Sequence, residues 1–289
     1  MRTSPSWTTS RPPSSSSVPA APPEGASAEE SVKVSGLTKK YRKVVAVDDL
    51  SFAVERGEFL GFLGPNGAGK TTTIRLLCGL LRPTTGSIEV AGVDVRRDPV
   101  LVKSRIGILP EDIDTFDRLT GLELLVFSGR MHGIAADACD KRALELLDLV
   151  GLDAADRGRM IVDYSMGMRK KVALAAALIH GPEVLFLDEP FNGVDVVSVR
   201  AIRDVLSELV RRGVTIFFSS HVMEVVEKLC TSFAIIDKGK LKACGTPDTL
   251  RCELGLGAEA NLEAIFLAAV GHAPRDVHLD WLEEKTGEA

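Results

Sequence analysis

The segment 64–71 constrains the fold more than any other part of the chain. It reads Gly64-Pro65-Asn66-Gly67-Ala68-Gly69-Lys70-Thr71 and fits the pattern G-x-x-x-x-G-K-[ST] at every fixed position. The glycines let the backbone bend tightly, so that successive N–H groups point inward at phosphate oxygens. The lysine supplies a charge to the β- and γ-phosphates, the threonine offers a hydroxyl to Mg²⁺, and the helix predicted over 72–81 directs its positive end to the same anion. The pattern predicts a nucleoside triphosphate site, without distinguishing a kinase, a GTPase or a motor.

Two acidic residues end a second apolar segment. The predicted strand 184–187 is followed directly by Asp188 and Glu189, and ligands of parallel sheets lie beyond the carboxyl ends of the strands. Asp188 is therefore placed to hold Mg²⁺, and Glu189 to activate the attacking water as a general base, unless the pair is only a solvated turn. Each contact between like charges costs about 4 kcal/mol at about 4 Å and an effective dielectric of about 20. We therefore expect Mg²⁺ to be required.

Strands alternate with helices on both sides of a helical stretch. Apolar periodicity predicts strands at 32–34, 44–47, 51–54, 58–63, 87–95 and 106–109, and helical structure from 120 to 179. After Pro182 it predicts strands at 184–187, 214–218 and 233–236, with helices near 197–212 and 222–230. Such alternation implies a parallel sheet covered on both faces. The coarse architecture is two αβ halves with a helical insert between them.

Bulk composition narrows the classes of partner. The 289 residues include 35 Lys and Arg against 40 Asp and Glu, and this net charge of −5 argues against nucleic acid as the main partner. The five cysteines form no C-x-x-C pair, which indicates reduced thiols in a cytosolic protein. No stretch approaches the roughly 18 apolar residues of a membrane span. We expect a soluble chain that reaches a membrane only through a partner.

A third motif makes the resemblance to a family specific. Tyr164-Ser165-Met166-Gly167-Met168 opens a helix just upstream of the acidic strand, and it resembles the signature motif of ATP-binding cassette (ABC) proteins in its export-type YSxGM variant. A serine there caps free N–H groups, and the remaining ones can bind an anion, although a plain helix cap would need the same residue. The resemblance implies that Ser165 and Gly167 contact the γ-phosphate held by another subunit.

Further positions match the same family one by one. Tyr41 stands where ABC proteins place an aromatic residue that stacks on adenine. Glu111 replaces the usual glutamine in a segment that resembles the Q-loop, as in many drug and antibiotic exporters. Asp195 ends a segment that resembles the D-loop, and His221 matches the switch histidine. The tail 261–267 resembles the LExxF ending of the drug and antibiotic resistance group.

The resemblance covers about residues 31–270 and implies an α/β fold. The expected fold is a P-loop NTPase ABC cassette, with a mostly parallel sheet core, an antiparallel β lobe and an inserted helical subdomain. The expected organisation is a disordered Ser/Pro-rich tail over 1–30, an ATPase domain over 31–245 with its helical subdomain at about 112–180, and a C-terminal helical extension over 246–289.

The resemblance also implies an ATPase that uses ATP and Mg²⁺, pairs with a second cassette and powers export through a separate transmembrane permease at the cytoplasmic face of the membrane. The implied catalytic residues are Lys70, Glu189 and His221, and the implied metal ligands are Thr71, Glu111 and Asp188. The implied nucleotide contacts are Tyr41, Gly64, Pro65, Asn66, Gly67, Ala68, Gly69, Lys70, Thr71, Thr72, Glu111, Ser165, Gly167 and Asp195.

Three other functions remain to be weighed. A non-transport ABC ATPase acting on DNA or the ribosome would share these motifs, but the chain has one cassette rather than a tandem pair and no basic excess. A small-molecule kinase explains Lys70 but not the ordered set Ser165, Glu189 and His221. A cassette that binds without turnover is disfavoured because both Lys70 and Glu189 are present.

Overall fold

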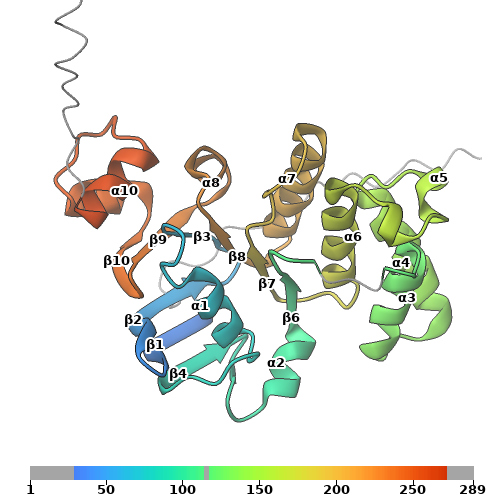
Figure 1. Ribbon diagram of the computed structural model, residues 1–289, viewed down its shortest axis with the longest axis horizontal. Coiled ribbons are helices and arrows are strands. Elements are labelled where there is room, and N and C mark those ends of the chain that lie inside the picture. The colour runs from blue at the N-terminus through green and yellow to red at the C-terminus, as the bar shows by residue number, and fades with distance from the viewer. Residues whose placement is uncertain (1–28, 114–116, 272–289) are drawn as a thin grey trace, which may run out of the picture.

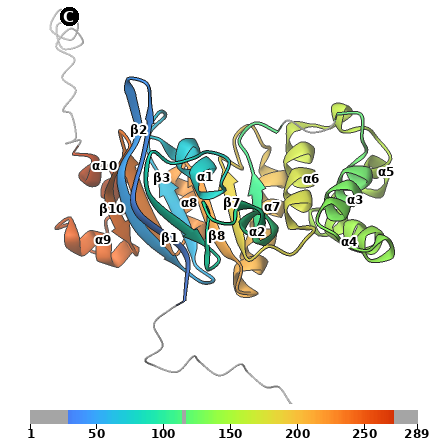
Figure 2. The ribbon, with the colours of Figure 1, turned by 90° about the horizontal axis from the view of Figure 1, so that it is seen from below.

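The computed structural model describes residues 29–113 and 117–271. The tail predicted over 1–30 lies outside these residues except for Glu29 and Glu30, and Glu30 already opens the first strand. Residues 272–289 of the expected C-terminal extension also lie outside them. Two views show a sheet-containing body at one end and a group of helices at the other (Figures 1 and 2).

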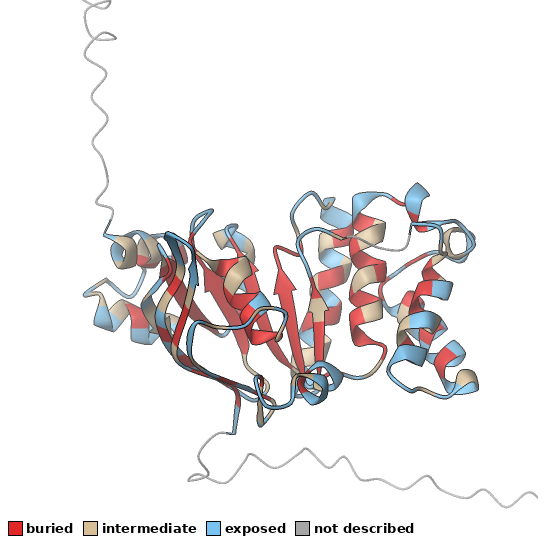
Figure 3. Cartoon of the chain, turned by 60° about the horizontal axis from the view of Figure 1, so that its bottom comes forward, coloured by how far each residue is buried: buried red, intermediate tan, exposed pale blue. Residues whose placement is uncertain are grey.

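Six strands form the larger sheet in the order β10-β9-β3-β8-β7-β6. The strands are β3 (Phe59–Leu63), β6 (Ile106–Leu109), β7 (Val184–Asp188), β8 (Thr215–Ser220), β9 (Ser232–Asp237) and β10 (Lys240–Gly245). All pair in parallel except β10, which is antiparallel to β9. Every residue of β3, β7 and β8 is buried (Figure 3). Burial on both faces explains why these strands are continuous apolar runs in the sequence.

A smaller antiparallel sheet has the order β2-β1-β4-β5. Its strands are β1 (Glu30–Tyr41), β2 (Val44–Glu55), β4 (Thr85–Val90) and β5 (Val93–Asp94). The two strands predicted at 44–47 and 51–54 are one strand, because an irregularity with Asp49 at φ 56° absorbs the polar break. The strand predicted at 87–95 is instead a hairpin, which turns at Ala91 and Gly92 with φ values of 50° and 73°.

Four helices lie between β6 and β7 in the chain and form the helical subdomain. These are α3 (Gly121–Met131), α4 (Ala136–Leu149), α5 (Ala154–Arg157) and α6 (Met166–Leu178), with the short 3₁₀ helix η1 (Ile161–Asp163) before α6. They enclose a hydrophobic core of their own, which includes Leu125, Leu147 and Ile179. A capping box of Thr120 and Glu123 begins α3, as the sequence T-x-x-E favours.

The other helices are α1 (Lys70–Leu77), α2 (Pro99–Arg105), α7 (Val196–Arg211), α8 (Met223–Leu229), α9 (Pro247–Glu253) and α10 (Leu262–Val270). The helix predicted over 72–81 begins and ends earlier, as α1, and Gly79 follows it at φ 66°. Neither α2 nor β10 was predicted from the sequence. No helix within 29–113 and 117–271 combines the length and the apolarity that a bilayer crossing requires.

Side chains alternate between two cores on the faces of the large sheet. Phe62, Phe186 and Phe217 point to the face that α1 and the small sheet cover, whereas Phe59 and Phe218 point to the face of α6, α7 and α8. The ring of Phe217 lies 5.0 Å from that of Phe62 and 5.6 Å from that of Phe186, between centroids. All five cysteines are free, in agreement with the expected reduced thiols.

The cluster around Phe217 yields a prediction about stability. Phe217→Ala removes a fully buried ring, and we expect it to lower the free energy of unfolding by about 3–5 kcal/mol. Val100→Ala, at a position that is 76% exposed, should change it by less than about 0.5 kcal/mol. Chemical denaturation followed by circular dichroism measures both, and equal stability of the two variants would contradict this assignment of the core.

Candidate functional site

The glycine-rich loop joins β3 to α1 beside the small sheet. Gly69 precedes α1 at φ 106°, and a Cβ atom there would lie 2.4 Å from the carbonyl oxygen of Ala46 on β2. A Cβ atom at Gly64 would lie 2.4 Å from the carbonyl oxygen of Ile236 on β9. Backbone oxygens cannot move aside as a flexible side chain could, so both positions need glycine. The loop is therefore shaped by close packing against two neighbouring strands.

A cavity of about 620 Å³ opens over this loop, within the size range of small-molecule sites. Its lining comes from the loop, two acidic residues, the start of β2 and the β9–β10 turn: Val44, Val45, Ala46, Pro65, Asn66, Gly67, Gly69, Lys70, Thr71, Thr72, Glu111, Glu189, Lys238 and Gly239. Most of the residues predicted from the glycine-rich motif are thus brought together with Glu111 and Glu189.

Five of these lining residues were not predicted from the sequence to belong to the site. Val44, Val45 and Ala46 begin β2, and Lys238 and Gly239 form a turn with φ values of 49° and 78°. That turn binds the loop directly, since the N–H of Gly239 donates to the carbonyl oxygen of Ala68 at 2.9 Å. The sequence marks a turn at 238–239, but only the fold brings it to the loop.

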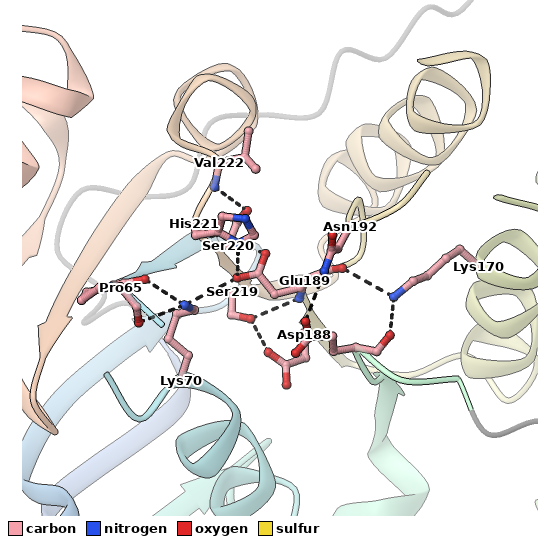
Figure 4. A network of polar contacts seen from close by, with 12 residues as sticks. Pro65, Lys70, Lys170, Asp188, Glu189, Asn192, Ser219, Ser220, His221 and Val222 are labelled. Atoms are coloured by element: carbon pink, nitrogen blue, oxygen red, sulfur yellow. Dashed lines mark hydrogen bonds and ion pairs between the residues drawn. The ribbon is translucent and has the colours of Figure 1, made fainter. Parts of the chain in front are cut away.

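Lys70 is buried at the floor of the site. Its Nζ donates to the carbonyl oxygen of Gly64 at 2.8 Å and to that of Pro65 at 3.4 Å, both within the loop (Figure 4). The same Nζ lies 3.5 Å from Oε1 of Glu189, so the ammonium and the carboxylate form a buried ion pair. The lysine predicted to bind phosphate is therefore next to the acid predicted to act as base.

Glu189 follows β7 and is held from several sides. Its side chain lies between Lys70 and His221. The ring Nδ1 of His221 is 2.9 Å from Oε1, and the backbone N–H of His221 donates to Oε2 at 3.4 Å. Its own N–H donates to the carbonyl oxygen of Ser219 at 3.1 Å. The backbone of Glu189 is left-handed, with φ at 45°. Such a conformation costs about 1–3 kcal/mol in a non-glycine residue and clusters at functional sites.

Asp188 is buried one residue earlier. Its Oδ1 accepts a hydrogen bond of 2.5 Å from the Oγ of Ser219, a residue on β8 that the sequence analysis did not identify. No signal in the sequence marks Ser219, because the contact depends on the pairing of β7 with β8.

The residues present fit a magnesium ion bound together with phosphates. Within 29–113 and 117–271, no cluster of three or more His, Cys, Asp or Glu could hold a metal unaided. Mg²⁺ usually keeps several waters and takes one or two carboxylates plus substrate phosphates. The carboxylate of Asp188 and the hydroxyl of Thr71, at the start of α1, match that requirement. Glu111 also lines the cavity, and its Oε1 accepts from Nδ2 of Asn192 at 3.3 Å.

Tyr41 does not line the cavity. It ends β1 at the tip of a hairpin and is 43% exposed, and the Nζ of Lys39 lies 5.0 Å from the centroid of its ring. The residues that line the cavity near this hairpin are Val44 and Val45, the first residues of β2. The structure therefore brings these valines, rather than Tyr41, to the wall of the site.

Three other predicted residues form a second group. Ser165 caps α6 by accepting from the N–H of Met168 at 3.3 Å, and Asp195 caps α7 by accepting from the N–H of Ser198 at 2.9 Å. That hydrogen bond lowers the pKa of the Asp195 carboxyl group. Gly167 packs against this cap so closely that a Cβ atom would lie 2.6 Å from the Ser198 hydroxyl. Ser165, Gly167 and Asp195 do not line the cavity of their own chain.

Comparison with known proteins agrees with this geometry. The family model described as "ABC transporter" matches residues 47–192. The linearmycin resistance ATP-binding protein LnrL of Bacillus subtilis is 39% identical over 224 residues, which cover 78% of this chain and 72% of LnrL. The daunorubicin resistance ATP-binding protein DrrA3 of Streptomyces coeruleorubidus is 42% identical over 229 residues, which cover 79% of this chain and 72% of DrrA3.

Solved structures confirm the expected fold. An ATP-binding subunit of an ABC transporter superposes with a TM-score of 0.77 at 30% identity, covering 83% of this chain and 99% of that one. A dimeric ATP-binding cassette, MJ0796 with ADP and phosphate in a post-hydrolysis state, has the same fold, with a TM-score of 0.70 at 22% identity over 74% of this chain and 98% of its own. The chain thus belongs to the ABC transporter family, as an ATP-binding subunit that hydrolyses ATP.

Proposed function

We propose that this subunit powers export through a separate membrane permease, at the cytoplasmic face of the membrane. The observation that carries the ATP-hydrolysing part of the proposal is the buried carboxylate of Glu189, which lies beside the phosphate loop between Lys70 and His221. The names of LnrL and DrrA3 refer to resistance against linearmycin and daunorubicin, and these similarities favour export of a drug-like compound.

In the proposed reaction Glu189 accepts the proton of the water that attacks the γ-phosphorus of ATP, while the bond from that phosphorus to the β–γ bridging oxygen breaks and ADP leaves. The backbone N–H of His221 donates to Oε2 of the same carboxylate and helps to hold it in place. Lys70 balances the charge of the phosphates, and it is already aimed at the loop that would surround them. Mg²⁺ would be held by Thr71 and Asp188, with Glu111 close to its waters, and would neutralise the phosphate oxygens.

Two cassettes are proposed to share each ATP. Ser165 and Gly167 lie at the start of α6, away from their own cavity, where free N–H groups of the helix can bind an anion. The surface beside them carries exposed apolar side chains, namely Met166, Val196 and Val197, which are 51%, 85% and 76% exposed. Apolar side chains gathered beside such a helix end favour contact with another protein. A second cassette seated there would receive the signature residues at its own phosphate loop.

The permease is proposed to dock where the helical subdomain meets the sheet. A groove of about 380 Å³ lies there, with Pro110, Ile113 and Leu124 in its lining. Glu111 follows Pro110 directly and also lines the nucleotide cavity, so one short segment borders both spaces. Movement of this segment during hydrolysis would reach the docked permease.

Purification of the full-length chain from detergent-solubilised membranes tests the proposed transport role. We expect a hydrophobic permease to remain bound and to raise the rate of ATP hydrolysis. Recovery of ribosomes or nucleic acid instead, with stimulation of turnover by them, would show a non-transport ABC ATPase and contradict the proposal.

The role of Glu189 is tested by Glu189→Gln. This variant keeps the shape of the side chain but removes the base, so kcat should fall by at least about 100-fold while ATP still binds. Dimers should accumulate with ATP and Mg²⁺, as measured by size-exclusion chromatography with light scattering. The control is Glu224→Gln, on the exposed first turn of α8. Turnover near the wild-type rate in Glu189→Gln would remove this residue from the reaction.

The metal requirement is tested by titration with Mg²⁺. Turnover should disappear in excess EDTA and return with Mg²⁺, because the buried acids Asp188 and Glu189 at the end of β7 would repel the phosphates of ATP without the metal. Asp188→Asn should raise the Mg²⁺ concentration at half-maximal activity by about 10-fold or more. Undiminished hydrolysis in chelator would refute the assignment of Asp188 and Thr71 to a metal.

A further inference from the structure

Lys170 is an unusually buried charge. It lies on α6, five residues after the capping Ser165, and only 1% of its surface is exposed. Removing an ammonium group from water is unfavourable unless partners replace the lost hydration. Burial is accordingly the main cause of the lowered pKa of Lys170, opposed by the charges of Glu111, Asp112, Asp188 and Glu189. The partners of its Nζ therefore identify what this charge stabilises.

Those partners are backbone carbonyl oxygens at the ends of two strands. The Nζ donates to Glu111 O at 2.7 Å, and it lies 3.5 Å from both Pro110 O and Glu189 O (Figure 4). Pro110 directly follows β6 and Glu189 directly follows β7, and these two strands are parallel neighbours. A single ammonium thus gathers the two chain segments that bring acids to the nucleotide cavity.

The contact with Glu189 is to a strained peptide. Glu189 has a left-handed backbone, and its carbonyl oxygen faces Lys170 while its carboxylate faces Lys70 and His221. A donor on the carbonyl side opposes relaxation toward an ordinary backbone conformation, which would turn the carboxylate away from the cavity. Lys170 therefore acts on the carboxylate through the backbone, without touching it.

We propose that Lys170 is a positioning residue that fixes the Glu189 peptide and the Glu111 segment to the helix that begins with Ser165. The inference rests on the proposed role of Glu189 in hydrolysis. The start of α6 then carries Ser165 and Gly167, which are proposed to contact the nucleotide of a second cassette. Its second turn carries Lys170, which binds the backbone of Glu111 and Glu189 in its own site. Displacement of α6 is thereby transmitted to the chain's own Glu189.

The neighbouring residue provides a matched control. Lys171 is also buried, at 9% exposure, and its Nζ donates to a backbone carbonyl oxygen, that of Gly151, at 3.2 Å. This contact stays inside the helical subdomain, whereas that of Lys170 crosses to the sheet. Loss of either ammonium should therefore cost stability, but only loss of that of Lys170 should disturb the reaction.

The experiment compares Lys170→Met with Lys171→Met in the full-length chain. Methionine fills the space without donating, so both variants should melt at a lower temperature than the wild type. In Lys170→Met we expect kcat to fall by about 10- to 100-fold, as a small displacement of a reacting group does, while the Kd for ATP changes by less than about threefold. Lys171→Met should keep kcat within about twofold. Lys170→Gln, which keeps a shorter, neutral donor, should lie in between and replaces Lys170→Met should that variant not fold.

Three outcomes would overturn the inference. The first is kcat near the wild-type value in Lys170→Met, or in Lys170→Gln where it replaces an unfolded Lys170→Met. The others are equal losses of kcat in Lys170→Met and Lys171→Met, and a loss of ATP affinity as large as the loss of kcat. Glu189→Gln separates the inference from the proposed function. An inactive Glu189→Gln beside an active Lys170→Met refutes the positioning role alone. An active Glu189→Gln refutes the catalytic assignment itself.

Discussion

The site depends on the parallel register of the central strands. Leu63 is paired with Ser220, and Asp188 with Ser219, so β3, β7 and β8 all end at the same level. The residues that follow these ends are therefore forced together: the phosphate loop after β3, Glu189 after β7 and His221 after β8. Hydrogen bonding between backbones, rather than any contact between the functional side chains, is what assembles the chemistry.

The same register brings together buried charged side chains, each of which would be destabilising if it were buried without a partner of opposite charge. Lys70, Lys170, Asp188 and Glu189 are all buried within one region at the strand ends. A buried ion pair adds little to stability once the loss of hydration is counted, but removing one partner leaves an expensive unpaired charge. The cluster therefore adds little to stability, and an incoming phosphate could replace the present partners of Lys70.

Much of this could be predicted from the sequence where a signal is local. Short runs of apolar residues and glycines predict three segments: the strand before Asp188 and Glu189, the strand 106–109 and the glycine-rich loop. All three lie close to where they were expected. Ser219 and Lys170 carry no local signal, because their roles arise from pairing between distant segments. Lys170 in particular reads as one charge in the basic run Arg169-Lys170-Lys171, and only the crossing of α6 over the strand ends reveals its partners. The sequence predicts two strands where the structure has the single strand β2, because the polar residues at its bulge resemble those of a turn.

The separate core of the helical subdomain affects how such a protein can diversify. Its apolar centre, with Leu125, Leu147 and Ile179, is not shared with either core beside the large sheet. Substitutions on the outer faces of α3 and α4 can therefore accumulate without disturbing the packing beneath the phosphate loop. Under the proposed function, a duplicated gene could in this way acquire a different permease while its ATP chemistry stayed the same, provided that Lys170 and the short segment after β6 were kept.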